Sequence, residues 1–295
     1  MKKILFKGCG TAIATPFTND GVNFEELKRL IDFQINEKVD AIIVCGTTGE
    51  SATMSLEEKK QTIKFVVDIV NKRIPVIAGT GSNNTNSAIE LSKYAEYVGA
   101  DGVLVVTPYY NKTTQEGLIS HYKSIASNIK IPIILYNVPS RTGVNILPQT
   151  CLKLSEIENI VAIKEASGDI SQVSKIASLC GQNLNIYSGN DDQIVPVLSL
   201  GGIGVISVLS NIEPNFTHEL VENYLKGNIN KALEYQLHAL DLINSLFTEV
   251  NPIPIKEALN LYGFNFGIPR LPLVPLSDNC KKSLIENIKK FKSIS

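Results

Sequence analysis

The sequence predicts a (β/α)8 barrel followed by a C-terminal helical extension. Eight short β-rich runs recur at intervals of roughly 25 to 35 residues, and a segment with helical periodicity follows each of them. The runs are almost continuously apolar, as in parallel strands that are covered on both faces. No dinucleotide-binding fingerprint follows the first run, so the alternation favours a barrel over a doubly wound sheet.

The predicted strands are short apolar runs bounded by turn residues. In chain order they span residues 10–17, 40–46, 74–81, 101–108, 131–139, 159–165, 183–190 and 202–208. In barrels of this kind the active site lies at the carboxyl ends of the strands and in the loops that follow them. Polar residues at those ends are therefore the first candidates for function.

The segments between the runs carry helix signals. Residues 24, 27, 31 and 35 are apolar and fall on one helical stripe. Ser55 and Glu58 have the spacing of a capping box, in which each side chain bonds to the other residue's backbone N–H. Gly99 follows another stripe, at the position where glycine commonly ends a helix.

The β signal stops after residue 208. Residues 215–228 and 229–247 have helical periodicity and are separated at Gly227, a proline-punctuated stretch runs from Pro252 to Pro275, and residues 277–291 form a last predicted helix. We therefore divide the chain into a catalytic barrel of residues 1–224 and a C-terminal helical extension of residues 225–295.

Composition excludes several classes of protein. The formal net charge is −1 and no basic stripe is present, which argues against a nucleic-acid partner. No apolar run approaches the length of a membrane span, and no signal peptide is recognisable, so we expect a cytoplasmic protein. The five cysteines form no C-x-x-C pair and the three histidines are far apart, so we expect no metal site.

One strand end carries the most reactive candidate. The run from Ile160 to Ile163 leads directly into Lys164, and a small polar turn follows. Burial lowers the pKa of a lysine, and only the neutral amine attacks a carbonyl, so this position suits Schiff-base chemistry. Taken alone, the run favours a lysine whose stem lies on the strand while its ammonium reaches solvent, because buried lysines are rare.

Strand alternation gives a direction to these side chains. If Lys164 faces the barrel interior, then Ala162 and Ile160 face it too, while Val161 and Ile163 face the helices. The same alternation turns Tyr136 inward on the neighbouring strand, within reach of the Lys164 amine as a general acid/base. Glu165, one residue further, points outward and is interpreted as structural.

Two more strand ends offer groups that suit carboxylates. Thr47 and Thr48 lie between glycines, so their hydroxyls and backbone N–H groups can bind a substrate carboxylate. Arg141 follows the strand that ends with Tyr136, and a guanidinium binds carboxylates in a bidentate manner. The alternatives are a tight turn before a helix for the threonines and a surface ion pair for Arg141.

Four motifs together closely resemble the dihydrodipicolinate synthase family of pyruvate-dependent, Schiff-base lyases. They are GTTGES at 46–51, TPYYN at 107–111, YNVPSRTG at 136–143 and IKEASGD at 163–169, and the similarity covers nearly the whole chain. The Thr47–Thr48 pair, where sialate lyases tend to have Ser-Thr, and Arg141 both favour the synthase within its superfamily.

The resemblance implies a reaction and a set of roles. Pyruvate condenses with L-aspartate 4-semialdehyde to give 4-hydroxy-tetrahydrodipicolinate, the first committed step of diaminopimelate and lysine biosynthesis, without a cofactor. Family members are usually homotetramers built as dimers of dimers, and occasionally dimers. The implied catalytic residues are Lys164, Tyr136, Thr47 and Tyr110, the last reaching in from a partner subunit, and the implied substrate-binding residues are Thr48, Arg141, Ile206 and Gly189.

The resemblance also locates a regulatory site. Lysine-inhibited bacterial relatives bind lysine with two histidines and a glutamate, and the matching positions here are Leu56, Lys59 and Ser87. The remaining positions of that site, Ser51, Ala52, Asn83 and Tyr109, match the family. A cationic Lys59 would repel the ammonium of a lysine effector, so we predict weak or absent lysine inhibition.

Other functions stay open at the level of sequence. An N-acetylneuraminate lyase or a keto-deoxy-sugar aldolase of the same superfamily would use the same lysine and tyrosine. A barrel isomerase could use the glycine-rich segments at 188–190 and 201–204 as a phosphate cradle, but it would leave Lys164 and Tyr136 without a role. A non-catalytic paralogue is disfavoured because every residue of the proton relay is present.

Overall fold

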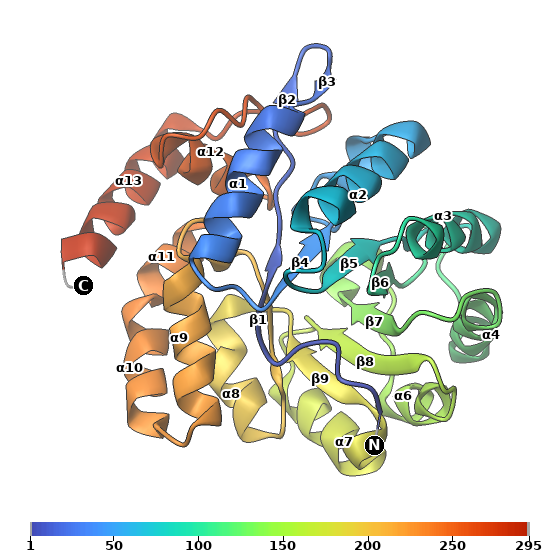
Figure 1. Cartoon of the computed structure of the whole chain (residues 1–295). Helices are drawn as coiled ribbons and strands as arrows, with labels where there is room; N and C mark the ends of the chain where they lie inside the picture. Colours follow the sequence, from blue (N-terminus) through green and yellow to red (C-terminus); the bar gives the residue numbers. More distant parts are fainter. Residues whose placement is uncertain (1, 294–295) are drawn as a thin grey trace.

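The computed structural model describes residues 2–293 and contains the expected barrel. Eight parallel strands pair in chain order and close between the first and the last (Figure 1). They are β1 (Gly8–Ala12), β4 (Ala41–Val44), β5 (Val76–Gly79), β6 (Gly102–Val106), β7 (Ile133–Asn137), β8 (Ile160–Glu165), β9 (Asn185–Ser188) and β10 (Gly204–Ser207). The predicted (β/α)8 fold is confirmed.

Helices surround the strands (Figure 1). They are α1 (Phe24–Asn36), α2 (Leu56–Val70), α3 (Thr85–Tyr97), α4 (Gln115–Ala126), α5 (Pro139–Thr142), α6 (Pro148–Ser155), α7 (Ile170–Cys180), α8 (Ile194–Ser199) and α9 (Pro214–Leu225). The predicted capping box is present, since Ser55 and Glu58 bond to each other's backbone N–H. Gly99 follows α3 with φ +92°, the left-handed conformation that glycine adopts at a helix end.

Apolar side chains fill two layers. One lies inside the barrel and contains Ile43, Ile77, Leu104, Ile134 and Ile206, and the larger one lies between the strands and the helices. Each strand is buried on both faces, which explains why the strand sequences are continuously apolar rather than alternating.

Two strand predictions need correction. The first strand begins at Gly8 and ends at Ala12, and Phe17 instead belongs to a small antiparallel hairpin of β2 (Phe17–Thr18) and β3 (Gly21–Val22). On β8 the register shifts, because Ile133 pairs with Ile160 whereas Ile134 pairs with Ala162. This bulge turns Val161 into the barrel and Ile160 toward the helices, the reverse of the prediction, while Ala162 and Ile163 face as predicted.

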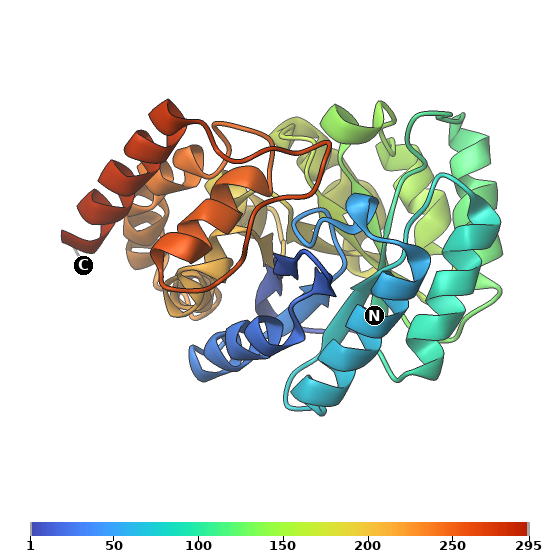
Figure 2. The ribbon, with the colours of Figure 1, turned by 90° about the horizontal axis from the view of Figure 1, so that it is seen from above.

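The C-terminal extension is helical, as predicted. It contains α10 (Ile229–His238), α11 (Leu240–Ser245), α12 (Ile253–Leu261) and α13 (Asp278–Ser293). Helix α12 lies inside the proline-punctuated stretch, where no helix was predicted, and prolines occupy its first turn, where a missing N–H costs nothing. Figures 1 and 2 both show α12 and α13 at one side of the barrel, beside α1. Within residues 2–293, no helix has the length and apolar character needed to cross a membrane.

Candidate active site

Lys164 and Tyr136 lie side by side at the carboxyl ends of β8 and β7. They are register partners on adjacent strands, and the Lys164 Nζ lies 4.5 Å from the centroid of the Tyr136 ring. Both side chains are almost completely buried, with exposed fractions of 5% and 6%. No carboxylate within residues 2–293 lies at ion-pair distance from the Lys164 amine. The strand end therefore holds a buried amine beside an aromatic ring that carries a hydroxyl.

Gly189 forms one wall of the space around Lys164. Its backbone N–H donates to the carbonyl of Glu165, at a distance of 2.7 Å. A Cβ atom on Gly189 would lie 2.6 Å from the Cβ of Ala166 and 3.1 Å from the Cε of Lys164. Only glycine allows this main chain to approach the lysine so closely.

The two threonines after β4 differ in exposure. Thr48 is 2% exposed, and its Oγ1 accepts a hydrogen bond from Nδ2 of Asn251 at 3.1 Å, whereas Thr47 is half-buried. The turn closes where the N–H of Glu50 donates to the carbonyl of Thr47. Thr48 is thus held from the C-terminal extension, a contact that the sequence motif does not reveal.

Arg141 projects from α5 and is exposed. Its Nη2 donates to the main-chain oxygen of Asn251 at 3.3 Å. Asn251 therefore contacts both Thr48 and Arg141, the residues expected to bind the two substrate carboxylates. Its side-chain Oδ1 is buried without a hydrogen-bond partner. Sequence reasoning missed Asn251, because it lies outside the strand ends.

A buried carboxylate supports the end of β10. Ile206 is completely buried inside the barrel, and Asp191 accepts hydrogen bonds from the N–H groups of Val208 and Leu209, at 2.9 and 3.0 Å. Burial raises the pKa of Asp191, although these hydrogen bonds and the charge of Lys164 oppose the shift. Asp191 fixes the turn after Ile206 and was not singled out by the sequence.

The two tyrosines after β6 point to the surface. Tyr110 is 91% exposed and has φ +69°, while Tyr109 is 39% exposed. Asn111, next to them, donates to the carbonyl of Asn83 at 3.1 Å. Within a single chain, Tyr110 does not join the buried pair of Lys164 and Tyr136.

The positions expected to form a regulatory site lie on the short helix after β4, on α2 and α3, and in the loops before α3 and after β6. Ser51 and Ala52 start the short helix η1 (Ser51–Thr53), Leu56 and Lys59 lie on α2, and Ser87 lies in the first turn of α3. Leu56, Ala52 and Ser87 are exposed, whereas Lys59 is half-buried. Burial lowers the pKa of Lys59, and the neighbouring Cys45 thiol opposes the shift.

A second buried lysine ties the extension to the substrate turn. Lys256 on α12 and Glu50 form an ion pair of 2.8 Å, and both side chains are 1% exposed. Glu50 also accepts from the N–H of Arg270 at 2.7 Å. Lys256 and Arg270 both lie over the Phe17 ring. No sequence pattern predicts this pair, because its members are 206 residues apart.

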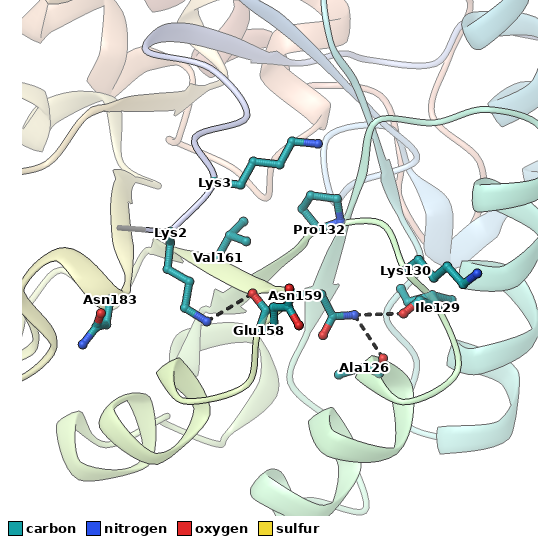
Figure 3. Close-up of a pocket in the computed structure, with 10 residues that line it drawn as sticks. All are labelled: Lys2, Lys3, Ala126, Ile129, Lys130, Pro132, Glu158, Asn159, Val161 and Asn183. Carbon is teal, nitrogen blue, oxygen red and sulfur yellow. Dashed lines mark hydrogen bonds between the residues drawn. The ribbon is translucent and has the colours of Figure 1, made fainter.

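Two other features lie elsewhere. One group within residues 2–293, His218, Glu219 and Glu222 on α9, has metal-ligand geometry, but His218 already bonds to Asp40. A cavity of about 740 Å³ opens at the amino ends of β7 and β8, opposite Lys164 (Figure 3). Its Lys2 ammonium and Asn159 amide donate to main-chain oxygens of the cavity wall.

A family model described as the dihydrodipicolinate synthetase family matches residues 5–291. The chain belongs to this family. It is 60% identical over 287 residues to 4-hydroxy-tetrahydrodipicolinate synthase 1 of Clostridium acetobutylicum, which covers 97% of this chain and 98% of the relative.

Solved structures of dihydrodipicolinate synthases have the same fold as this chain. The chain matches dihydrodipicolinate synthase from Thermotoga maritima with a TM-score of 0.96 and 46% identity, over 98% of this chain and 99% of that one. It also matches the synthase of Cyanidioschyzon merolae, solved with lysine bound, with a TM-score of 0.95 and 39% identity, over 98% and 99% of the two chains.

The predicted activity is confirmed with the family. The chain is a lyase that condenses pyruvate with L-aspartate 4-semialdehyde through a Schiff base, in the biosynthesis of diaminopimelate and lysine. Sialate lyase and keto-sugar aldolase, the alternatives within the superfamily, are disfavoured by the identity of the synthases over nearly the whole chain. The barrel isomerase and the non-catalytic paralogue are disfavoured for the same reason.

Proposed function

We propose that Lys164 is the Schiff-base nucleophile of this condensation and that Tyr136 is its proton-transfer partner. The observation that carries the proposal is their geometry: a buried amine without a carboxylate partner, 4.5 Å from a tyrosine ring. A nucleophilic lysine must be neutral, and an ion pair would favour its protonated form. The hydroxyl of Tyr136 can then transfer protons at the amine as general acid/base.

The proposed steps balance without a cofactor. The Lys164 amine attacks the ketone of pyruvate and water leaves, giving an imine. Loss of a methyl proton gives the enamine, whose carbon attacks the aldehyde of aspartate semialdehyde and forms the new C–C bond. The α-amine of the second substrate then attacks the imine carbon, which closes the ring and releases Lys164. Each step transfers a proton at the Lys164 nitrogen, at the carbon next to the imine or at the oxygen of the attacked carbonyl group. These atoms lie close together, so one relay that includes the Tyr136 hydroxyl can serve all the steps.

Residues at the carboxyl ends of the strands and in the loops after them would bind the two substrate carboxylates. Thr48, through its hydroxyl and backbone, and the segment at Ile206 would hold the pyruvate carboxylate, with Gly189 shaping the wall beside it. Arg141 would bind the carboxylate of aspartate semialdehyde, since it is exposed and a guanidinium offers two parallel donors. The contacts of Asn251 with Thr48 and Arg141 support this pairing of the two sites.

Thr47 and Tyr110 would complete the proton relay, with Tyr110 supplied by a second copy of the chain. The support for this assignment is that Tyr110 is 91% exposed, which suits an aromatic residue that crosses a subunit interface. We propose a homotetramer built as a dimer of dimers, with a dimer as the alternative. We also propose a cytoplasmic location, because the chain is homologous to enzymes of lysine biosynthesis.

Borohydride trapping tests the proposal. Reduction in the presence of pyruvate converts the imine to a stable secondary amine, so we expect irreversible inactivation and one pyruvate-derived mass adduct, on the peptide that contains Lys164. Lys164→Ala should show neither. The assignment of Lys164 is wrong if the adduct forms on another lysine, or if the wild-type enzyme keeps its full activity after borohydride reduction with pyruvate.

A further inference from the structure

A polar cluster lies directly behind the Lys164–Tyr136 pair, on the helix side of the barrel. It consists of Asn137, Asn145, Glu165 and Gln172. Asn137 and Glu165 are register partners that follow Tyr136 and Lys164 on their strands, and their exposed fractions are 0% and 3%. Because side chains alternate along a strand, this second pair faces the helices while the reactive pair faces the barrel.

Glu165 holds this cluster together. Its Oε2 accepts from Nδ2 of Asn137 at 3.0 Å and from Nε2 of Gln172 at 3.2 Å, and its Oε1 accepts from the N–H of Ser167 at 2.7 Å. No lysine or arginine side chain in the described part of the chain forms an ion pair with it. A buried carboxylate that depends on neutral donors requires each of them in place, because an unmet charge is costly.

The cluster also fixes the loop that carries Arg141. That loop leaves β7 at Asn137 and returns at Ile146, whose N–H donates to Oδ1 of Asn137 at 2.9 Å. Asn145 accepts from Nδ2 of Asn137 at 2.7 Å and donates to Oε1 of Gln172 at 2.7 Å. Both ends of the Arg141 loop are therefore tied to one side chain of the cluster.

We propose that Glu165 and Asn137 are positioning residues for the reaction: their hydrogen bond sets the approach of Tyr136 to Lys164, and through Asn145 the same cluster sets the Arg141 loop. Glu165 touches no reacting atom and acts through the strand ends. The proposal rests on the roles proposed above for Lys164, Tyr136 and Arg141. It assigns a function to a residue that the sequence pattern marks only as structural.

Glu165→Gln is the direct test. A glutamine amide replaces one carboxylate oxygen by an NH2 group, which would face either the single donor bonded to Oε1 or the two donors bonded to Oε2. At least one hydrogen bond of the cluster is therefore lost while the shape of the side chain is kept. We expect the rate of borohydride-trapped adduct formation with pyruvate to fall about 10- to 100-fold, since a displacement of the reacting groups by a fraction of an ångström costs rates of this order.

Asn145→Ala separates the two effects. It leaves the bonds of Asn137 to Glu165 and to the Ile146 N–H in place and removes only the side-chain bonds of Asn145 to Asn137 and Gln172, which loosens the Arg141 loop. We therefore expect an increase in KM for aspartate semialdehyde of about tenfold, with trapping by pyruvate nearly unchanged. This variant removes a half-buried side chain, so it also tests the proposal if Glu165→Gln does not fold.

Glu213→Gln is the matched control. Glu213 is a half-buried carboxylate whose pKa is raised by burial, and its side chain accepts a hydrogen bond from the Tyr262 hydroxyl and not from a residue of the cluster. We expect it to lower thermal stability without changing trapping or either KM by more than about twofold. If folded Glu165→Gln traps pyruvate at the wild-type rate, or if Asn145→Ala leaves the KM for the aldehyde unchanged, the positioning role is wrong. Failure of the wild type to form the adduct would instead overturn the role of Lys164, and this proposal with it.

Discussion

The tetrapeptide Ile-Lys-Glu-Ala occurs twice in the chain, at residues 163–166 and 255–258, and both lysines are buried. Each ammonium lies over an aromatic ring, Lys164 at 4.5 Å from the Tyr136 centroid and Lys256 at 4.3 Å from the Phe17 centroid. They differ in their partners. Lys256 forms a 2.8 Å ion pair with Glu50, whereas Lys164 has no carboxylate partner within residues 2–293.

Secondary structure causes this difference. At the end of β8 the lysine faces the barrel and the following glutamate faces the helices, so the two charges are separated by the sheet. On α12 the lysine faces inward to Glu50, while Glu257 bonds to Lys281 near the surface. Burial alone therefore does not make a lysine a nucleophile. The reactive copy is distinguished by a tyrosine hydroxyl beside it and by the lack, within residues 2–293, of a carboxylate at ion-pair distance.

The largest expected effect is on catalysis, when the proposed nucleophile Lys164 is replaced by methionine. Lys164→Met removes the nucleophile, so kcat should fall by about 10⁴-fold or more. Its thermal stability should fall less than that of Lys256→Met, because Lys164 forms no ion pair within residues 2–293 and the buried Asp191 keeps its hydrogen bonds to Val208 and Leu209. Steady-state kinetics and thermal unfolding of the same preparation check both statements. Residual turnover above about 1% of the wild type would contradict the assignment.

The next largest effect concerns the aromatic ring. Tyr136→Phe keeps the ring beside Lys164 and removes only the hydroxyl, so kcat should fall about 10²- to 10⁴-fold. Tyr187→Phe is the matched control, because Tyr187 is the register partner of Lys164 on β9, but its buried hydroxyl donates to the carbonyl of Phe6 at 2.7 Å. That variant should lose about 1 kcal/mol of stability and keep its kcat. Equal kinetic losses in both variants would show that packing, rather than proton transfer, explains Tyr136.

The sequence predicted the fold and the reactive strand end because both depend on local patterns. Apolar runs with polar ends located the strands, and they placed Lys164 beside Tyr136. The bulge at Ile160 and Val161 could not be predicted, since an apolar run carries no alternation that would reveal a change of face. Lys256, Asn251 and the partners of Glu165 depend on contacts between distant segments, and no local pattern records which carboxylate a buried lysine will meet.

Lys256→Met should act on stability rather than chemistry. It leaves Glu50 buried without its counter-ion, so the free energy of unfolding should fall by about 3–5 kcal/mol, measured by urea denaturation. Turnover of the folded enzyme should fall by less than about tenfold, because the ion pair supports the Thr48 turn but touches no substrate. Adding Glu50→Gln to Lys256→Met should cost less than the sum of the single changes.

Lys281→Met is the control for this experiment. Its ion pair with Glu257 is partly exposed, with the lysine side chain 44% exposed, so its loss should cost less than about 1 kcal/mol. If Lys256→Met is no more destabilising than Lys281→Met, the buried pair does not hold the extension to the barrel.

The smallest expected effect concerns a third lysine, Lys59, and the response of the enzyme to free lysine. Lys59 is half-buried in α2, burial lowers its pKa, and it has no carboxylate partner in the described chain. A free lysine that binds beside it would bring a second ammonium into a desolvated site, where like charges repel strongly. Sub-millimolar lysine should therefore change the initial rate by less than about twofold.

Lys59→His removes the permanent cation, so it should increase the inhibition by lysine if the charge of Lys59 is the reason for the weak response. Strong inhibition of the wild type would show that Lys59 does not face the effector, and an unchanged response in Lys59→His would assign the insensitivity to Leu56 and Ser87.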